Sequence, residues 1–189
     1  MSAPHLNQEQ KEQLLTIARQ TLDSHFSSGA LPEYDISDAA LLQQAGVFVT
    51  LWEQNHNLRG CVGRLEVSDP LYKTVQYCTI ASATRDLRFA PVSAAEAGRL
   101  IIEVSVLSVP EKITRPEQIE IGRHGLLIRR EWPDVRVGLL LPQVASKRGW
   151  NREQFLKAVC QKAGLPADAW RHADLYTFET EVFEEGEDG

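Results

Sequence analysis

The sequence predicts an α+β fold, a mixed α/β arrangement in which helices pack on a central, mostly antiparallel sheet, with a smaller second lobe. Two observations support this class. Capped amphipathic helices are interspersed with apolar strands that return through short polar turns, which is typical of hairpins rather than of an alternating parallel sheet. The 189 residues are 43% hydrophobic and 24% charged, as in an ordinary globular domain. We expect one domain over 1–189, with part of 66–100 forming the smaller lobe.

The first half of the chain contains two helix starts around one hairpin. Asn7 and Gln10 form a capping-box signature before an amphipathic stretch, and Asp69 with Pro70 predicts a second helix start. Between them, two apolar strands flank a polar turn, and the second strand is interrupted by glycines. The predicted elements are a helix over 7–26, strands over 46–52 and 58–65, and a helix that begins at 69–70.

The second half carries the strand with the highest content of β-branched residues. Ser93 with Glu96, and Asn151 with Gln154, are further capping-box signatures for helices. Apolar strands on both sides of Trp132 predict a second hairpin. The predicted elements are a short helix after 93, a strand over 99–109, strands over 125–130 and 136–141, a helix from 151 and a closing strand over 175–183.

The negative charge is concentrated at the C-terminal end. The chain has 20 Lys and Arg against 26 Asp and Glu, and six of those acids follow Phe178, which leaves 20 acids and 20 bases in the rest. We expect Glu179 and Glu181 on the outward face of a strand and 184–189 as a short acidic tail. A balanced body argues against binding of duplex nucleic acid, which usually requires a basic excess. Stacking on single strands stays open.

Other patterns bear on location and cofactors. The apolar runs are too short to span a membrane, and the N-terminus lacks a signal-peptide pattern, so we expect a cytoplasmic protein without membrane partners. Three cysteines without close pairing indicate a reducing compartment. The histidines have no metal-type spacing, so no metal site and no cofactor are expected.

The segment 58–63, LRGCVG, is the first candidate site. Gly60 and Gly63 flank Cys61 and leave backbone N–H groups open to a ligand, while Arg59 offers a fork for an anion and would favour a thiolate. The alternative is structural: cysteine is among the most buried residue types, and glycine in a strand often marks a bulge.

Three other places carry polar groups in suggestive positions. Asp86, Arg88 and Phe89 lie in an irregular segment ended by a proline, where the acid and base either aim at one ligand or pair with each other. Glu103 and Ser105 share one face of an apolar strand and need partners or solvent. His124 with Gly125 forms the fourth candidate; the histidine could act as a base, also for Cys61, or as a turn donor.

Together these segments resemble the AmmeMemoRadiSam system protein A family, whose eukaryotic members are the AMMECR proteins. The resemblance covers the chain from the first helix nearly to the end. One departure is Leu87, where the family usually has proline in Asp-Pro-Arg-Phe, which loosens that loop. The resemblance rests on LRGCVG at 58–63, DLRFAP at 86–91, IIEVSVL at 101–107, GRHGLLI at 122–128 and LLLPQVA at 139–145.

The resemblance implies a two-part α/β fold whose motif residues line a shared cleft, and prokaryotic partners that are Memo-like and radical-SAM proteins. It implies no reaction. We favour a binding or accessory module that holds a small anion or a partner; the alternative is an enzyme with Cys61 as nucleophile on a small anionic substrate. The residues carried over are Cys61, Glu103 and His124 as catalytic candidates, and Arg59, Gly60, Gly63, Asp86, Arg88, Phe89, Ser105 and Gly125 as ligand-binding candidates.

Overall fold

The computed structural model describes residues 5–65 and 68–186, and it confirms the α+β class with two four-stranded antiparallel sheets. The chain divides into a larger unit, formed by 4–107 with 181–189, and a smaller unit, formed mainly by 108–180. The described part of 66–100, expected in the smaller lobe, lies in the larger unit instead. A lone hairpin and helix could not bury both faces of a sheet, whereas 108–180 supplies four strands of its own.

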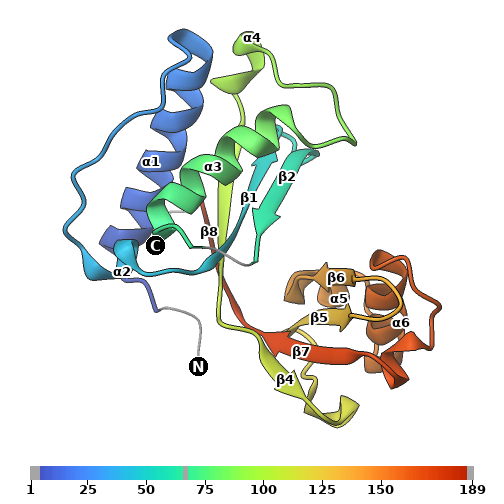
Figure 1. Cartoon of the computed structure of the whole chain (residues 1–189). Coiled ribbons are helices and arrows are strands. Elements are labelled where there is room, and N and C mark those ends of the chain that lie inside the picture. The colour runs from blue at the N-terminus through green and yellow to red at the C-terminus, as the bar shows by residue number, and fades with distance from the viewer. Residues whose placement is uncertain (1–4, 66–67, 187–189) are drawn as a thin grey trace. The chain divides into compact units, whose positions relative to one another are not determined.

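The larger unit consists of one sheet with helices on one of its faces (Figure 1). Its strand order is β2-β1-β3-β8. All helices and strands of this unit lie before Ser108 in the sequence, except β8. Its helices are α1 (Gln8–Ser27), α2 (Ala39–Leu42), α3 (Leu71–Thr84) and α4 (Ala94–Ala97), and its strands are β1 (Gly46–Trp52), β2 (Leu58–Arg64), β3 (Ile101–Leu107) and β8 (Thr180–Glu184).

Local sequence explains where these helices begin. The predicted capping box forms at the start of α1, where the Asn7 side chain accepts from Gln10 N and the Gln10 side chain accepts from Asn7 N, each at 2.9 Å. The same motif opens α4 at Ser93 and Glu96. The start of α3 differs from expectation, because Pro70 occupies the cap position and no side chain caps the helix.

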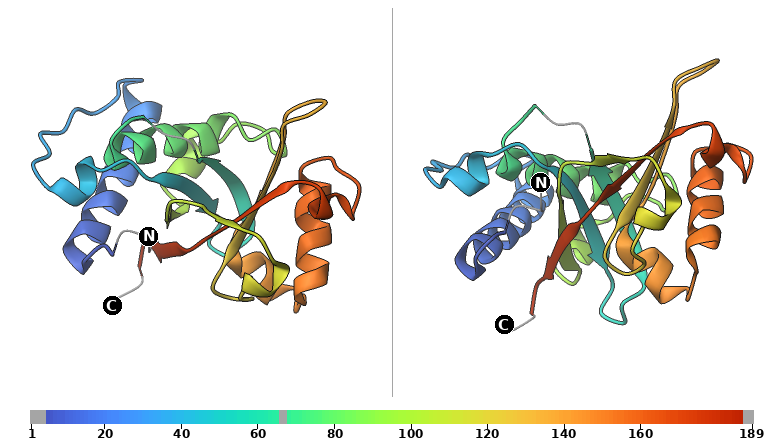
Figure 2. Two further views of the ribbon diagram at one scale, coloured as in Figure 1. Left: turned by 60° about the horizontal axis from the view of Figure 1, so that its bottom comes forward. Right: turned by 90° about the horizontal axis from the view of Figure 1, so that it is seen from below.

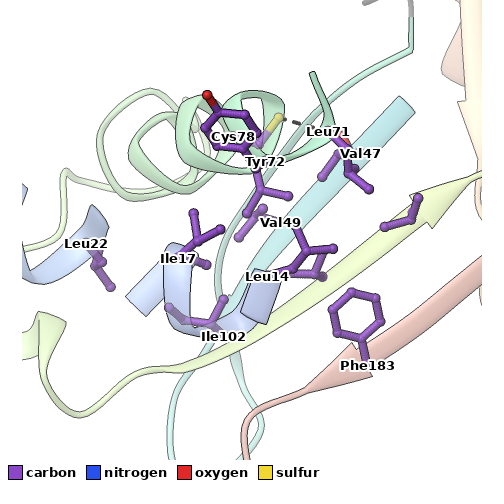
Figure 3. Close-up of a cluster of buried hydrophobic side chains, with 14 of the residues drawn as sticks. Leu14, Ile17, Leu22, Val47, Val49, Leu71, Tyr72, Cys78, Ile102 and Phe183 are labelled. Atoms are coloured by element: carbon purple, nitrogen blue, oxygen red, sulfur yellow. Dashed lines mark hydrogen bonds between the residues drawn. The ribbon is translucent and has the colours of Figure 1, made fainter. Parts of the chain in front are cut away.

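One hydrophobic cluster fills the larger unit between α1, α3 and the sheet. Leu14 and Ile17 of α1 meet Val49 of β1 and Ile102 of β3, all buried (Figure 3). The Cys78 thiol in α3 donates to the Val47 carbonyl at 3.7 Å, so this cysteine serves as a core residue. Alternate residues of β1 and β3 point into this cluster, which leaves the other set of side chains on the opposite face of the sheet.

The smaller unit has its own sheet, of order β4-β7-β5-β6, and its own hydrophobic cluster (Figure 2). Phe155 and Val159 of α6 are fully buried against Leu126 and Ile128 of β5. The predicted hairpin around the cis Trp132–Pro133 bond is present as β5 and β6. The elements are β4 (Glu111–Ile113), η1 (Pro116–Gln118), β5 (Gly125–Arg130), β6 (Arg136–Leu140), α5 (Pro142–Lys147), α6 (Arg152–Lys162), η2 (Ala169–Arg171) and β7 (Asp174–Phe178).

The expected closing strand over 175–183 is two strands, one in each sheet. Glu179 lies between them and accepts from Arg123 Nε at 2.7 Å, while Glu181 pairs with Lys11 Nζ at 2.8 Å. The first residues of the expected acidic tail are also ordered. Glu184 ends β8, and Glu185 accepts from Arg19 Nε at 2.8 Å and from Ile102 N at 2.9 Å. Residues 187–189 lie outside the described residues.

Within residues 5–65 and 68–186, the helices are all too short or too polar to cross a bilayer.

Candidate functional site

The sheet of the larger unit presents a row of polar side chains on the face away from α1 and α3. Thr50 of β1 lies opposite Cys61 of β2 on one side and opposite Glu103 of β3 on the other. The next row joins Phe48 to Gly63 and to Ser105 in the same way. We call this surface the Cys61 face; it consists of Phe48, Thr50, Trp52, Cys61, Gly63, Glu103 and Ser105. Strand register therefore brings together four of the predicted site residues.

Hydrogen bonds fix the polar groups of the Cys61 face. The Thr50 hydroxyl donates to the Cys61 sulfur at 3.3 Å, and the Trp52 indole N–H donates to Glu103 Oε2 at 3.3 Å. Ser105 is fully buried, and its hydroxyl has no hydrogen-bond partner among the residues that the structure describes. A buried hydroxyl without a partner costs about 1–3 kcal/mol, so this face contains an unmet polar group.

The segment after α3 crosses the open edge of β2 and attaches to it through Asp86. One carboxylate oxygen, Oδ2, accepts from the Cys61 backbone N–H at 2.8 Å and from Arg88 Nη2 at 2.6 Å. The other, Oδ1, accepts from Arg88 Nε at 2.9 Å. Arg88 Nη2 also lies 3.4 Å from the Cys61 carbonyl. The Asp86 side chain is only 7% exposed, whereas that of Arg88 is 54% exposed, so Asp86 holds the guanidinium in place beside Cys61 while solvent still reaches it.

The surroundings shift the pKa values of Asp86 and Cys61 in opposite directions. Hydrogen bonds from Arg88 lower the pKa of Asp86 from 3.8 to about 2, so the carboxylate is charged at neutral pH. Burial raises the pKa of the Cys61 thiol, the hydrogen bond from Thr50 and the charge of Arg88 oppose this rise, and Glu103 adds to it. The sequence-based expectation that arginine would make Cys61 a thiolate is therefore corrected: desolvation outweighs the nearby positive charge, and the thiol stays protonated.

The positive charge beside Cys61 does not come from Arg59, because the Arg59 guanidinium is hydrogen-bonded to other groups of the protein. Nε donates to Glu96 Oε1 at 3.0 Å, Nη1 to the Ala90 carbonyl at 3.0 Å, and Nη2 approaches the Pro91 carbonyl at 3.4 Å. The side chain is 11% exposed. This geometry favours a brace between β2 and the segment before α4 over the ligand-binding role predicted from sequence.

The two glycines of the motif permit close approaches. A Cβ at Gly60 would collide with the backbone carbonyl of Ser82 in α3, and a Cβ at Gly63 would collide with the ring of Phe48. The Ser82 hydroxyl enters the β1–β2 ladder, accepting from Val62 N at 2.8 Å and donating to the Val49 carbonyl at 2.7 Å. Gly60 and Gly63 thus serve packing of the sheet, rather than exposing backbone N–H groups to a ligand.

The remaining predicted residues are distributed over both units. Phe89 follows Arg88 in the same segment, with the guanidinium carbon 5.4 Å from its ring centre, and Leu87 is fully exposed. His124 and Gly125 belong to the smaller unit, which is described by itself.

In the smaller unit, His124 has a defined local environment. His124 Nδ1 accepts from Glu120 N at 3.2 Å, which leaves Nε2 to carry the proton of the neutral ring. It lines a cavity of about 200 Å³ with Ser108, Arg123 and Glu179. A Cβ at Gly125 would collide with the Phe178 ring, so this glycine also permits close packing.

The chemistry available in the part of the chain that the structure describes is narrow. Across 5–65 and 68–186, His, Cys, Asp and Glu side chains form no cluster that could hold a metal ion. The Cys61 face offers a protonated thiol, a carboxylate and, at its edge, a fixed guanidinium. It can therefore hold an anion or hydrogen-bond a polar partner more readily than it can attack an electrophile.

Sequence reasoning missed Thr50 and Ser82. Thr50 could have been found, because pairing the two predicted strands around the polar turn sets Thr50 against Cys61. Ser82 carried no signal, because its partners in β1 and β2 are more than 19 residues away along the chain.

The chain is similar to known proteins in sequence and in fold. A family model described as AMMECR1 matches residues 15–183. Protein MK0488 of Methanopyrus kandleri is 42% identical over 192 residues, covering 96% of this chain and 91% of that protein. Protein PF1979 of Pyrococcus furiosus is 40% identical over 195 residues, covering 95% and 90%. The crystal structure of uncharacterized protein PH0010 from Pyrococcus horikoshii is similar, with a TM-score of 0.89, 38% identity and coverage of 96% and 94%.

Proposed function

The chain belongs to the AMMECR1 family, and from that premise we propose that it is a binding or accessory module whose ligand or partner docks on the Cys61 face. The bound group is an anion: a small one, or an acidic side chain of a partner protein. The partners expected from the resemblance are a Memo-like protein and a radical-SAM protein. We place this activity in the cytoplasm, without duplex nucleic acid as a ligand.

One observation carries this proposal: Asp86 fixes Arg88 beside Cys61, and the Arg88 side chain stays half exposed. Asp86 occupies the guanidinium edge formed by Nε and Nη2, so the proposal assigns the anion to Nη1. A guanidinium held in advance loses little side-chain freedom when it binds a carboxylate or phosphate.

The second candidate function is an enzyme that uses Cys61 as a nucleophile. The hydrogen bond from Thr50 to the sulfur favours it, because such a donor stabilises a thiolate. The raised pKa of Cys61 counts against it. Glu103 is also poorly placed as a direct base, because it lies two strands from Cys61, about 10 Å at ordinary strand spacing.

A binding titration tests the proposal. The purified protein is titrated with a Memo-like protein and with a radical-SAM protein from the same genome, and with inorganic phosphate and citrate as small anions. We expect Arg88→Gln to weaken binding about ten-fold, because a charge-assisted contact is lost. Cys61→Ser should change affinity less than about two-fold, since serine is also uncharged and can accept the hydrogen bond from Thr50.

Two controls make this test specific. Arg99→Gln removes an exposed arginine of the same unit and should leave binding unchanged. Arg88→Lys keeps the charge and loses the fork, so it should give an intermediate affinity. If Cys61→Ser abolishes binding while Arg88→Gln leaves it unchanged, or if none of these probes binds, the proposed function is wrong.

A further inference from the structure

A groove in the larger unit lies on the solvent side of α3, apart from the Cys61 face. Its cavity volume is about 540 Å³, within the range of about 300–1,000 Å³ typical of small-molecule sites. One wall is the exposed side of α3 between Tyr72 and Arg85, and the other is the loop 31–34 that follows α1. Tyr72 and Arg85 are thirteen positions apart along α3, so the groove is about 20 Å long.

Hydrogen bonds hold the loop wall in position. Gln76 Nε2 in α3 donates to the Pro32 carbonyl at 2.8 Å, and the Tyr34 hydroxyl donates to Gln20 Oε1 of α1 at 2.9 Å. Both contacts tie the loop to helices that pack on the core. The groove is thus formed before any ligand arrives, which reduces the ordering that binding would require.

The lining is aromatic and apolar along most of its length. Tyr34, Tyr72 and Tyr77 contribute rings, and Leu31 and Ile80 contribute aliphatic surface. Leu31 is 56% exposed and Tyr77 is 37% exposed, so apolar surface remains open to water in the groove. Covering it with the apolar body of a ligand would be favourable at about 25 cal/mol per Å².

The charges of the groove favour an anion. Its cations are Lys73 and Arg85, and its acids are Glu33 and Asp69. Asp69 faces Arg64 at 3.8 Å, which leaves one net positive charge in the groove of a protein whose total charge is −6.

The positive charge is centred on Tyr77. Arg85 Nη1 donates to the Tyr77 hydroxyl at 3.3 Å, and the Arg64 guanidinium lies 3.9 Å from the ring centre. Lys73 precedes Tyr77 by one helical turn, so its side chain lies on the same side of α3. An aromatic surface and a cation held by a hydrogen bond therefore meet at Tyr77.

We propose that this groove binds a small amphiphilic anion, an aromatic compound that carries one carboxylate or phosphate group. Its ring contacts Tyr77 and Ile80, and its anionic group lies against Arg85. The proposal is independent of the Cys61 face, because no residue of that face lines the groove.

Phenyl phosphate and benzoate are suitable probes, with benzyl alcohol as a neutral probe of similar ring size. Binding is followed by amide chemical shifts in the ¹⁵N spectrum of the whole protein. We expect saturable shifts on the amides of 72–85 and 31–34 with both anions, and affinity at least about five-fold weaker for benzyl alcohol, because the charge-assisted contact is missing. Arg85→Gln should weaken both anions about five-fold, whereas Arg99→Gln should have no effect.

Two outcomes would overturn the proposal: shifts confined to other regions, or equal affinity for the neutral and anionic probes. Unchanged affinity in Arg85→Gln would do the same. A thermal melt of each variant checks that the fold is intact, and Tyr77→Leu, which keeps apolar surface and removes the ring, provides a second variant that should also weaken phenyl phosphate.

Discussion

Single residues of the LRGCVG segment have different tasks from those that their types indicate. Arg59 braces the segment before α4, Gly60 admits the Ser82 carbonyl, and Cys61 keeps its proton. Arg88, 27 positions later, supplies the exposed cation beside Cys61. Sequence spacing could not assign these tasks, because each depends on a contact with a residue far along the chain.

Gly60 gives the sharpest prediction at this scale. Gly60→Ala should destabilise the protein by about 2–3 kcal/mol, because a methyl group would displace the Ser82 backbone from the sheet. Gly98→Ala is the matched control, since a Cβ there meets no atom within 4 Å, and its effect should be within about 0.5 kcal/mol. Urea unfolding measures both, and equal effects would show that the close approach at Gly60 is unimportant.

At the scale of elements, the junction of β2 with the segment after α3 controls the site. Two side chains of residues 82–86 attach this stretch to β2. The Ser82 hydroxyl accepts from Val62 N within the β1–β2 ladder, and the Asp86 carboxylate accepts from the Cys61 N–H at the sheet edge. This also covers backbone groups of an edge strand that would otherwise be open to pairing with another chain. The segment that carries Arg88 is thereby fixed, although Leu87 within it is fully exposed.

The Asp86 contacts predict a pH dependence. Because the folded-state pKa of Asp86 is lowered from 3.8 to about 2, its contribution to stability is complete above about pH 4 and disappears as the pH falls towards 2. Asp86→Asn should therefore lower the free energy of unfolding at pH 7 by about 1–2 kcal/mol, a range that allows for the exposure of Arg88.

The difference between Asp86→Asn and the unchanged protein should shrink as the pH is lowered from 4 to 2, when followed by urea unfolding at each pH. Asp35→Asn, an exposed position before α2, should parallel the unchanged protein throughout. A constant difference for Asp86→Asn would show that its charge is not the stabilising feature.

At the scale of the whole molecule, the chain forms two units, each with its own sheet and hydrophobic cluster. Periodicity and capping signatures predicted the main helices and the two hairpins, because these depend on neighbouring residues. The division between the units could not be predicted from these patterns. Residues 175–183 show one continuous apolar alternation, yet they form two strands, β7 and β8, which belong to different sheets. The short α2, β4 and α5 carried too little pattern to be predicted.

The candidate site divides in the same way. Glu103, Ser105 and Cys61 were predicted, and strand register brings them to one face, while His124 and Gly125 belong to the other unit. What the sequence could not provide was the state of the thiol. Its environment combines burial with Thr50, Glu103 and Arg88, which come from two strands and the segment after α3.

We propose that the Cys61 face binds rather than reacts, and the ionisation of Cys61 distinguishes these two roles. In a Cys78→Ala, Cys160→Ala variant, the rate of alkylation by iodoacetamide is measured against pH, for the folded protein and in urea. We predict a higher midpoint for the folded protein, because burial disfavours the thiolate. A folded-state midpoint below that in urea would contradict the account and establish an activated nucleophile.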